Sequence, residues 1–219
     1  METKKNSILV VDDHQLFREG LSQMINREAD LHVCAEAGDD KTALEAMQSA
    51  KPDMAIIDIS LAGSNGIDLI KLIRTSDTET PILVLSMHDE SLYAERALRS
   101  GANGYIMKQE ANKRVRDAIR QVLSGEIYLS EKMSTQLVSK LIGGRNEATK
   151  SPMDTLSPRE LEVFELIGQG HGTRQIAEAM KLTIPTINSF RARIKEKLNL
   201  KNASELVLNA IQWVQNKQK

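Results

Sequence analysis

The chain has 219 residues, of which 41% are hydrophobic and 27% charged, and its formal net charge is −1. This balance excludes a globally disordered chain, and the length favours two compact domains. The single cysteine, Cys34, excludes an intramolecular disulfide scaffold and favours a reducing compartment.

The N-terminal sequence METKKNSILVV contains one short apolar run, which Asp12 and Asp13 interrupt. This run is too short for the core of a signal peptide or for a membrane span. We therefore expect a cytoplasmic protein that has no membrane partner.

Short apolar runs alternate with amphipathic helical stretches through the first 125 residues. The runs are SILVV, LHVCAEA, MAIID, PILVLS and GYIM. Parallel strands need crossover helices, and those helices cover both faces of the sheet. The pattern predicts an α/β, doubly wound, five-stranded parallel sheet, and we assign this domain to residues 1–128.

A different pattern follows the predicted sheet. Residues 129–154 combine one helical stretch, SEKMSTQLVSKLIGG, with the polar segment GRNEATKSPMD, and we interpret them as a linker helix and a flexible linker. Residues 155–219 are purely helical in pattern. Ser157, Pro158 and Glu160 predict an N-cap, a first-turn proline and the third-position glutamate of a capping box.

Charge is unevenly divided between the two parts. Residues 1–150 hold 19 basic and 23 acidic side chains, a balance of −4, whereas the remaining residues hold 10 and 7, a balance of +3. A basic excess at the C-terminal end is what a nucleic-acid partner requires, although a balance of this size is weak evidence alone.

Polar side chains follow the predicted strands at the edge where open parallel sheets bind ligands. They are Asp12, Asp13, Asp58, Ser86 and Lys108. Each one alone is ordinarily a helix cap or a solvated turn residue. Three neighbouring carboxylates, however, repel one another unless a cation joins them, and oxygen ligands suit Mg²⁺. The added lysine and hydroxyl indicate phosphoryl transfer.

The segments ILVVDDH, PDMAIIDISLAGSNGIDL, PILVLS and GANGYIMK resemble the receiver domain of two-component response regulators over residues 7–124. The resemblance implies a flavodoxin-like strand order 2-1-3-4-5 and makes Asp58 the phosphoacceptor. It implies Mg²⁺ ligands from Asp12, Asp13, Asp58 and the Ser60 carbonyl. Ser86 and Lys108 would bind the phosphoryl group, and Tyr105 would be an aromatic switch; simple core packing explains Tyr105 equally well.

Two positions depart from the receiver pattern. The loop after Asp58 lacks the usual proline turn, which predicts a more flexible loop. Gln109 follows Lys108 where many receivers have proline, and this puts a cis peptide bond at that point in doubt.

The C-terminal pattern predicts four helices, with a short turn before the third, which is a helix-turn-helix arrangement. The third helix starts near Ile184, and its apolar stripe is Ile187, Phe190, Ile194 and Leu198. The opposite face is charged and can be merely solvated. As a recognition surface, it would offer Asn188, Ser189, Ala192 and Arg193 to base edges, and Thr186, Arg191, Lys195 and Lys197 to phosphates.

This domain resembles the LuxR-type output domain, so the whole chain resembles a NarL/FixJ-family response regulator. The matching segments are LSPREL, IAEAM and TINSF, whereas Ile187-Asn188-Ser189-Phe190 replaces the usual Val-Lys-x-His, so no operator sequence can be transferred. The resemblance implies that the last helix forms a dimer surface with residues such as Leu206, Leu208, Ile211 and Val214, some of which must also pack the domain, and that the dimer reads two DNA half-sites.

The resulting expectation is a transcription regulator rather than an enzyme. A cognate sensor histidine kinase would phosphorylate Asp58, and the resulting homodimer would bind double-stranded promoter DNA. One alternative is regulation without phosphate. Another is an aspartate-nucleophile phosphatase of the haloacid dehalogenase type, but those enzymes carry Asp-x-Asp after the first strand, where this chain has adjacent Asp12 and Asp13.

Overall fold

The structure is a computed structural model that describes residues 5–142 and 152–217. The chain divides into two compact units, Met1–Ile142 and Gly143–Lys219. Most of the polar segment predicted as a flexible linker, residues 143–151, lies outside the described residues.

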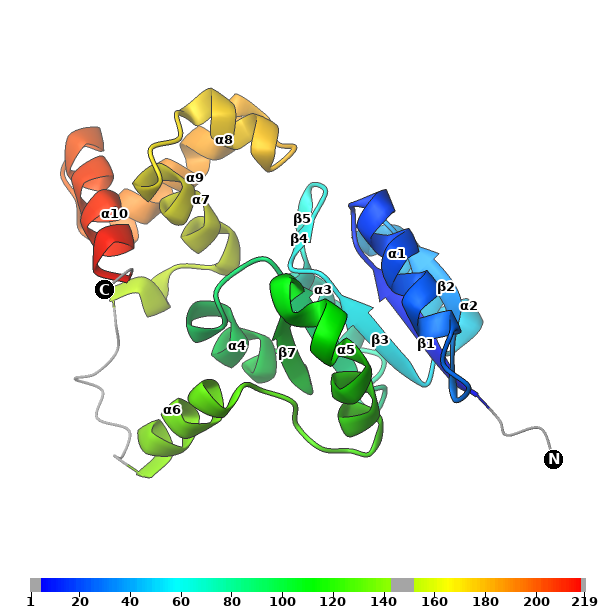
Figure 1. The fold of residues 1–219 in the computed structure, drawn as a ribbon. Helices are drawn as coiled ribbons and strands as arrows, with labels where there is room; N and C mark the ends of the chain where they lie inside the picture. Colours follow the sequence, from blue (N-terminus) through cyan, green and yellow to red (C-terminus); the bar gives the residue numbers. More distant parts are fainter. Residues whose placement is uncertain (1–4, 143–151, 218–219) are drawn as a thin grey trace. The chain divides into compact units, whose positions relative to one another are not determined.

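The first unit is built on five parallel strands in the order β2-β1-β3-β6-β7 (Figure 1). The strands are β1 (Asn6–Val11), β2 (Leu31–Ala37), β3 (Met54–Ile57), β6 (Ile82–Ser86) and β7 (Gly104–Met107). Since β6 and β7 are the fourth and fifth strands of this sheet, the predicted order 2-1-3-4-5 is confirmed. Val11 pairs with Ile57, and Ser86 pairs with Met107, so the carboxyl ends of the strands meet at one edge.

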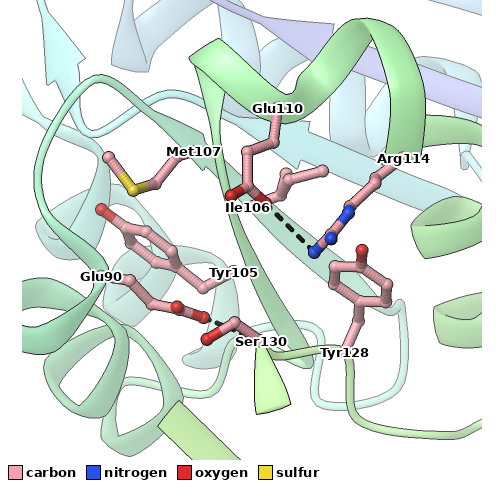
Figure 2. A pocket seen from close by; sticks show the side chains of 8 residues that line it. All are labelled: Glu90, Tyr105, Ile106, Met107, Glu110, Arg114, Tyr128 and Ser130. Atoms are coloured by element: carbon pink, nitrogen blue, oxygen red, sulfur yellow. Dashed lines mark hydrogen bonds and ion pairs between the residues drawn. The ribbon is translucent and has the colours of Figure 1, made fainter. Parts of the chain in front are cut away.

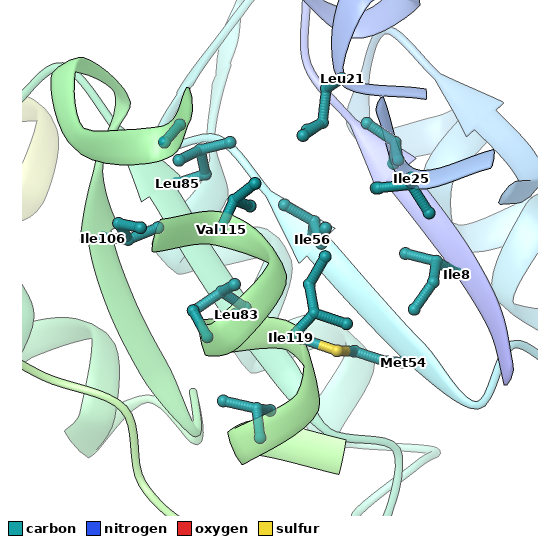
Figure 3. Packing of buried hydrophobic residues seen from close by; sticks show 14 of the residues in the cluster. Ile8, Leu21, Ile25, Met54, Ile56, Leu83, Leu85, Ile106, Val115 and Ile119 are labelled. Carbon is teal, nitrogen blue, oxygen red and sulfur yellow. The ribbon is translucent and has the colours of Figure 1, made fainter. Parts of the chain in front are cut away.

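Helices cover both faces of this sheet. They are α1 (Gln15–Asn26), α2 (Asp40–Ala50), α3 (Gly66–Arg74), α4 (Glu90–Arg99) and α5 (Lys108–Leu123). Leu21 of α1 and Ile119 of α5 pack with Ile8 and Ile56 of the strands in one buried cluster (Figure 3). Burying such aliphatic side chains stabilises a fold by roughly 1.5–3 kcal/mol each, so this cluster fixes the position of the sheet edge.

The loop after Asp58 is a short antiparallel hairpin. Ser60–Leu61 (β4) pairs with Ser64–Asn65 (β5), and Gly63 takes a positive φ of 76° at the turn. The Gly66 N–H donates to the Ile59 carbonyl at 2.8 Å, and a Cβ at Gly66 would lie 2.0 Å from the Asp58 carbonyl oxygen. The loop thus has regular pairing that its lack of proline did not predict.

Helix α5 begins at Lys108, directly after β7. A proline at position 109 would disfavour helical geometry for the residue before it, whereas Gln109 allows Lys108 to be the first helical residue. No peptide bond is cis among the residues described.

The predicted linker helix, α6 (Glu131–Ile142), belongs to the first unit and lies beside α4. Lys140 Nζ lies 2.7 Å from Glu95 Oε2, and the Ser130 N–H donates to Glu90 Oε1 at 2.9 Å. Before α6, Tyr128 forms a parallel bridge to Gly104, with the Tyr105 N–H donating to the Tyr128 carbonyl at 2.9 Å. The segment after α5 therefore extends the β7 edge of the sheet.

The second unit is helical. Its elements are the 3₁₀ helix η2 (Pro152–Thr155), α7 (Pro158–Gly168), α8 (Thr173–Ala179), α9 (Ile184–Lys197) and α10 (Ala203–Lys217). The predicted capping box at α7 is confirmed: the Glu160 N–H donates to Ser157 Oγ at 3.3 Å, and the Ser157 N–H donates to Glu160 Oε2 at 2.7 Å. Thr183 caps α9, which confirms its predicted start.

Gly168 sets the distance between α7 and α10. A Cβ at this position would lie 2.4 Å from the Ala210 carbonyl oxygen and 2.5 Å from Val214. The helices are close because the glycine has no side chain, and Phe164 and Trp213 make an aromatic contact with ring centroids 5.6 Å apart. Across the described parts of both units, no helix combines the length and apolar character that crossing a bilayer requires.

Candidate functional site

The polar residues predicted at the strand ends lie together at the carboxyl edge of the sheet. The Asp12 N–H donates to the Ala37 carbonyl at 3.0 Å, and the Asp58 N–H donates to the Val11 carbonyl at 2.9 Å. These sheet-type hydrogen bonds fix the backbone from which both carboxylates project. Ser86 ends β6 and Lys108 begins α5.

Lys108 joins two buried carboxylates. Its Nζ lies 2.6 Å from Asp12 Oδ2 and 2.7 Å from Asp58 Oδ2, and the three side chains are only 5%, 3% and 2% exposed. The same Nζ lies 4.5 Å from the centroid of the Phe17 ring, a cation–π contact. A buried charge needs such partners, because an unpaired one is strongly disfavoured.

The electrostatics of Asp58 follow from this burial. Burial raises the pKa of Asp58 from 3.8 to about 6, the Asp12 carboxylate also raises it, and Lys108 opposes the rise. Burial lowers the pKa of Lys108, but Asp58 and Asp12 outweigh that effect and raise it above its ordinary value. The site therefore carries excess negative charge at neutral pH, and a divalent cation would relieve it.

Four residues offer ligand atoms within 4.8 Å of one another: Asp12, Asp13, His14 and Asp58. Three are the predicted carboxylates, and their hard oxygen donors fit Mg²⁺. His14 was missed by the sequence reasoning. Its Nδ1 lies 2.8 Å from Asp13 Oδ1, and its backbone N–H donates to Asp12 Oδ1 at 2.9 Å, so it orients the acidic pair.

Ser60 flanks Asp58 in the β4 strand of the hairpin. Its N–H donates to Asp58 Oδ1 at 3.3 Å. Its hydroxyl lies 2.9 Å from His88 Nε2, in the loop between β6 and α4. Ser60, whose carbonyl is expected to bind the cation, is thus hydrogen-bonded both to Asp58 and to His88 in the loop after β6.

Ser86 and Tyr105 meet at His88. The His88 N–H donates to Ser86 Oγ at 3.1 Å, and the Tyr105 hydroxyl donates to the His88 carbonyl at 2.8 Å. Tyr105 is 1% exposed, and burial raises the pKa of its hydroxyl. It lines a small pocket with Tyr128, Glu90 and Ser130 (Figure 2). Tyr105 therefore packs in the core and also contacts the loop after Ser86; its switching role stays a prediction.

The candidate DNA-contacting residues lie on α9. Asn188, Ser189, Ala192 and Arg193 are exposed, whereas Thr186, Arg191 and Lys195 are partly exposed. Ile187 and Ile194 of the opposite stripe are buried, as predicted, and Phe190 and Leu198 are partly buried. The helix thus packs by one face and leaves the candidate base-contacting face open to solvent.

Lys197 has a structural partner that the sequence did not reveal. Its Nζ lies 2.6 Å from Glu160 Oε2, whose side chain is almost fully buried. Burial raises the pKa of Glu160, but Lys197 and Ser157 outweigh that effect and lower it. Lys197 therefore fastens α9 to the capping box of α7.

The residues expected at a dimer surface separate into two groups. Leu206 is 0% exposed and packs inside its own domain, so it is not available to a second copy. Leu208 is 58% exposed, and Ile211 and Val214 are partly exposed. Of these four residues, Leu208, Ile211 and Val214 therefore leave apolar surface accessible on α10.

A five-stranded receiver-type sheet with a buried acidic site, joined in one chain to a helix-turn-helix unit, defines a signal-responsive DNA-binding regulator. Family models agree with this class. The response regulator receiver domain matches residues 8–120, and the domain described as bacterial regulatory proteins, luxR family, matches residues 154–210.

Known proteins match over both units. "Oxygen regulatory protein NreC" of Staphylococcus aureus (strain JH9) is 36% identical over 208 residues, covering 93% of this chain and 96% of the relative. A LuxR-family response regulator from Aurantimonas sp. SI85-9A1 is 31% identical, covering 64% of this chain and 99% of that structure, with a TM-score of 0.59. RcsB from Salmonella enterica serovar Typhimurium, whose structure was solved bound to promoter DNA, has the same fold. It is 24% identical, covering 95% of this chain and 98% of that structure, with a TM-score of 0.58.

The chain belongs to the NarL/FixJ family of response regulators. It is a two-component response regulator that controls transcription, with a receiver domain and a LuxR-type DNA-binding domain.

Proposed function

We propose that Asp58 accepts a phosphoryl group from a cognate sensor histidine kinase, and that this controls dimerisation and sequence-specific DNA binding. The observation that carries the proposal is the buried Lys108, whose Nζ lies within 2.7 Å of both Asp12 and Asp58, in the same edge as Ser86. A lysine, a hydroxyl and a carboxylate at one sheet edge are the groups that phosphoryl transfer to a protein side chain needs.

In the transfer step, an Asp58 carboxylate oxygen attacks the phosphorus of the kinase's phosphohistidine. The new O–P bond forms as the P–N bond breaks, and the imidazole leaves with the electron pair of that bond. The pKa of about 6 for Asp58 leaves this carboxylate mostly ionised at neutral pH, as a nucleophile must be. Lys108 and the Ser86 hydroxyl then donate to the phosphoryl oxygens.

Mg²⁺ held by Asp12, Asp13, Asp58 and the Ser60 carbonyl would neutralise the phosphoryl oxygens during transfer. The excess of acidic groups around Asp58, where Lys108 is the one described cation paired with both buried carboxylates, supports this assignment. His14 would act through Asp13, since it contacts that carboxylate.

The expected response starts at Ser86. When its hydroxyl turns toward the phosphoryl group, the hydrogen bond from the His88 N–H is lost, and the loop that holds the Tyr105 hydroxyl moves. Tyr105 also donates its backbone N–H to Tyr128, just before α6. This chain of contacts supports a path from the phosphoryl site to the segment that leads to the DNA-binding domain.

The output is a homodimer on promoter DNA. Leu208, Ile211 and Val214 of α10 would contact the second copy, and two α9 helices would read two half-sites. The chain itself turns over no substrate in this scheme, because the phosphoryl group is a signal carried on Asp58. We expect this chain to bind both partners, the DNA and the phosphohistidine of the kinase, in the cytoplasm.

Intact-mass measurement after incubation with Mg²⁺ and acetyl phosphate tests the proposal. We expect one added phosphate on the native chain and on Asp68→Asn, a control that changes an exposed carboxylate paired with Lys71. We expect none on Asp58→Asn. Sedimentation of the same samples should show dimer only where phosphate is present. Modification of Asp58→Asn, or none on the native chain, would contradict the assignment and favour regulation without phosphate.

A further inference from the structure

His88 makes four contacts that converge from different elements. Its ring Nε2 lies 2.9 Å from the Ser60 hydroxyl, and its backbone N–H donates to the Ser86 hydroxyl. Its carbonyl accepts from Tyr105, and its ring stacks on Tyr93 of α4 with centroids 4.4 Å apart and planes 26° apart. His88 therefore connects the hairpin after β3, the end of β6, β7 and α4.

The ring of His88 performs two separable jobs. Stacking on the fully buried Tyr93 holds the plane of the ring against the core. The Nε2 contact then reaches across to Ser60, whose N–H donates to the Asp58 carboxylate. The ring thereby joins the hairpin that follows Asp58 to the loop between β6 and α4.

We propose that His88 is a positioning residue of the cation site: through its Nε2 contact it holds Ser60 in place beside Asp58. This inference rests on the proposed Mg²⁺ site. Ser60 lies in a two-residue strand whose partner strand also has two residues, so local pairing alone holds it weakly. The ring of His88 is fixed on Tyr93, and its contact with Ser60 restricts the motion of Ser60 before a cation binds. Binding then costs less conformational entropy.

A set of substitutions separates the tether from packing. His88→Phe keeps an aromatic ring for Tyr93 and removes Nε2. His88→Gln keeps a polar side chain of similar reach: its amide nitrogen can donate to the Ser60 hydroxyl, or its amide oxygen can accept from that hydroxyl. Ser60→Ala removes the partner atom from the other side and leaves the ring unchanged.

The test is a calorimetric titration of the full, unphosphorylated chain with Mg²⁺. His88→Phe and Ser60→Ala should each weaken Mg²⁺ affinity about three- to tenfold, as expected for one lost hydrogen bond that supports a ligand. The double variant should be no weaker than either single variant, because both remove the same contact. His88→Gln keeps the hydrogen bond to Ser60 but loses the stack on Tyr93, so it should bind Mg²⁺ more tightly than His88→Phe and more weakly than the native chain.

Two outcomes overturn the inference, and they differ in what they say about the proposed function. If the native chain binds Mg²⁺ and is phosphorylated, but His88→Phe and Ser60→Ala bind Mg²⁺ as tightly, the positioning role is wrong and the proposed function stands. If the native chain neither binds Mg²⁺ nor takes up phosphate, both fail. Denaturant unfolding of each variant confirms that the receiver domain is folded, and Ser60→Ala keeps the test decisive should His88→Phe not fold.

Discussion

The acidic edge of the receiver and the exposed face of α9 satisfy their polar groups in opposite ways. At the edge, Lys108 and two carboxylates are buried and fix one another within 2.7 Å. On α9, Asn188 and Arg193 are exposed to solvent. At the acidic edge, the fold itself pairs the charged groups. Changes there should therefore alter the free energy of unfolding and its dependence on pH. The second region depends on DNA, and changes there should leave the fold intact.

The largest effect should come from Lys108→Met. It removes the cation between Asp12 and Asp58 and leaves two buried carboxylates facing each other, which should lower the free energy of unfolding by about 3–5 kcal/mol near neutral pH without Mg²⁺. Urea unfolding measures this, and added Mg²⁺ should restore part of the loss. A variant as stable as the native chain would show that the edge is not internally paired.

Asp58→Asn should stabilise the receiver in a pH-dependent way. Burial raises the pKa of Asp58 from 3.8 to about 6, so the folded chain holds this proton more tightly than the unfolded chain. The resulting stabilisation is complete below about pH 4 and is lost as the pH rises through 6. The variant should therefore gain about 3 kcal/mol near neutral pH in the absence of Mg²⁺ and almost nothing near pH 4. If the variant and the native chain differed in free energy of unfolding by the same amount at both pH values, the raised pKa of Asp58 would be wrong.

One glycine in the receiver and one in the DNA-binding domain allow a matched comparison of the two domains. Gly66→Ala would place a Cβ 2.0 Å from the Asp58 carbonyl oxygen, and Gly168→Ala would place one 2.4 Å from that of Ala210. Each should cost about 2 kcal/mol through overpacking. Only Gly66→Ala should also impair uptake of phosphate, measured by intact mass, and only Gly168→Ala should lower the melting point of the DNA-binding domain.

Gly20→Ala is the control for both, because a Cβ there meets nothing within 4 Å in α1. It should be neutral or slightly stabilising, by up to about 1 kcal/mol. Loss of phosphorylation in Gly168→Ala would mean that the two units do not fold independently.

Substitutions of the two α9 residues Arg193 and Lys195, which are candidate DNA contacts, should affect DNA binding and not stability. Lys195→Ala, at a candidate phosphate contact, should reduce the dependence of log affinity on log salt by about one unit per protomer. Arg193→Ala, at a candidate base contact, should weaken specific binding by about 1–3 kcal/mol and leave non-specific binding less affected. Fluorescence anisotropy of DNA binding at several salt concentrations separates the two effects. Lys71→Ala, in the receiver, should change neither the salt dependence nor the specific affinity.

The smallest effect should come from Lys140→Ala. Its ion pair with Glu95 is largely exposed on the lysine side, and such pairs contribute about 0–1 kcal/mol. Global unfolding should barely change, but hydrogen exchange in α6 should become faster. Exchange in α6 that matches the native chain would show that packing, including the buried Met133, holds this helix without the ion pair.

Local patterns in the sequence predicted the parts of the fold that depend on neighbouring residues. The five strands, the capping box at Ser157 and Glu160, and the start of α9 were all predicted because alternation, capping and short turns act over a few residues. The family of the chain was predicted as well, and comparison with known proteins confirms it. The residue types at the strand ends also predicted that the carboxylates and Lys108 would meet.

Long-range partners could not be predicted in this way. Ser60 and His88 are 28 residues apart, and Lys197 and Glu160 are 37 apart, so no local period connects them. The β4–β5 hairpin has strands too short to show alternation. Leu206 and Leu208 both lie on an amphipathic helix, and the packing of α10 on α7 and α9 leaves the first buried and the second exposed.

The bridge between Tyr128 and Gly104 has a further consequence for the sheet. β7 is an end strand, and end strands offer unpaired backbone groups that invite pairing with another chain. The Tyr105 N–H donates to Tyr128, and the Tyr128 N–H donates to Asn103. The chain segment that leads out of the receiver thus also shields the β7 edge of the sheet from edge-to-edge aggregation, so a receiver fragment cut before Tyr128 should be prone to association through β7.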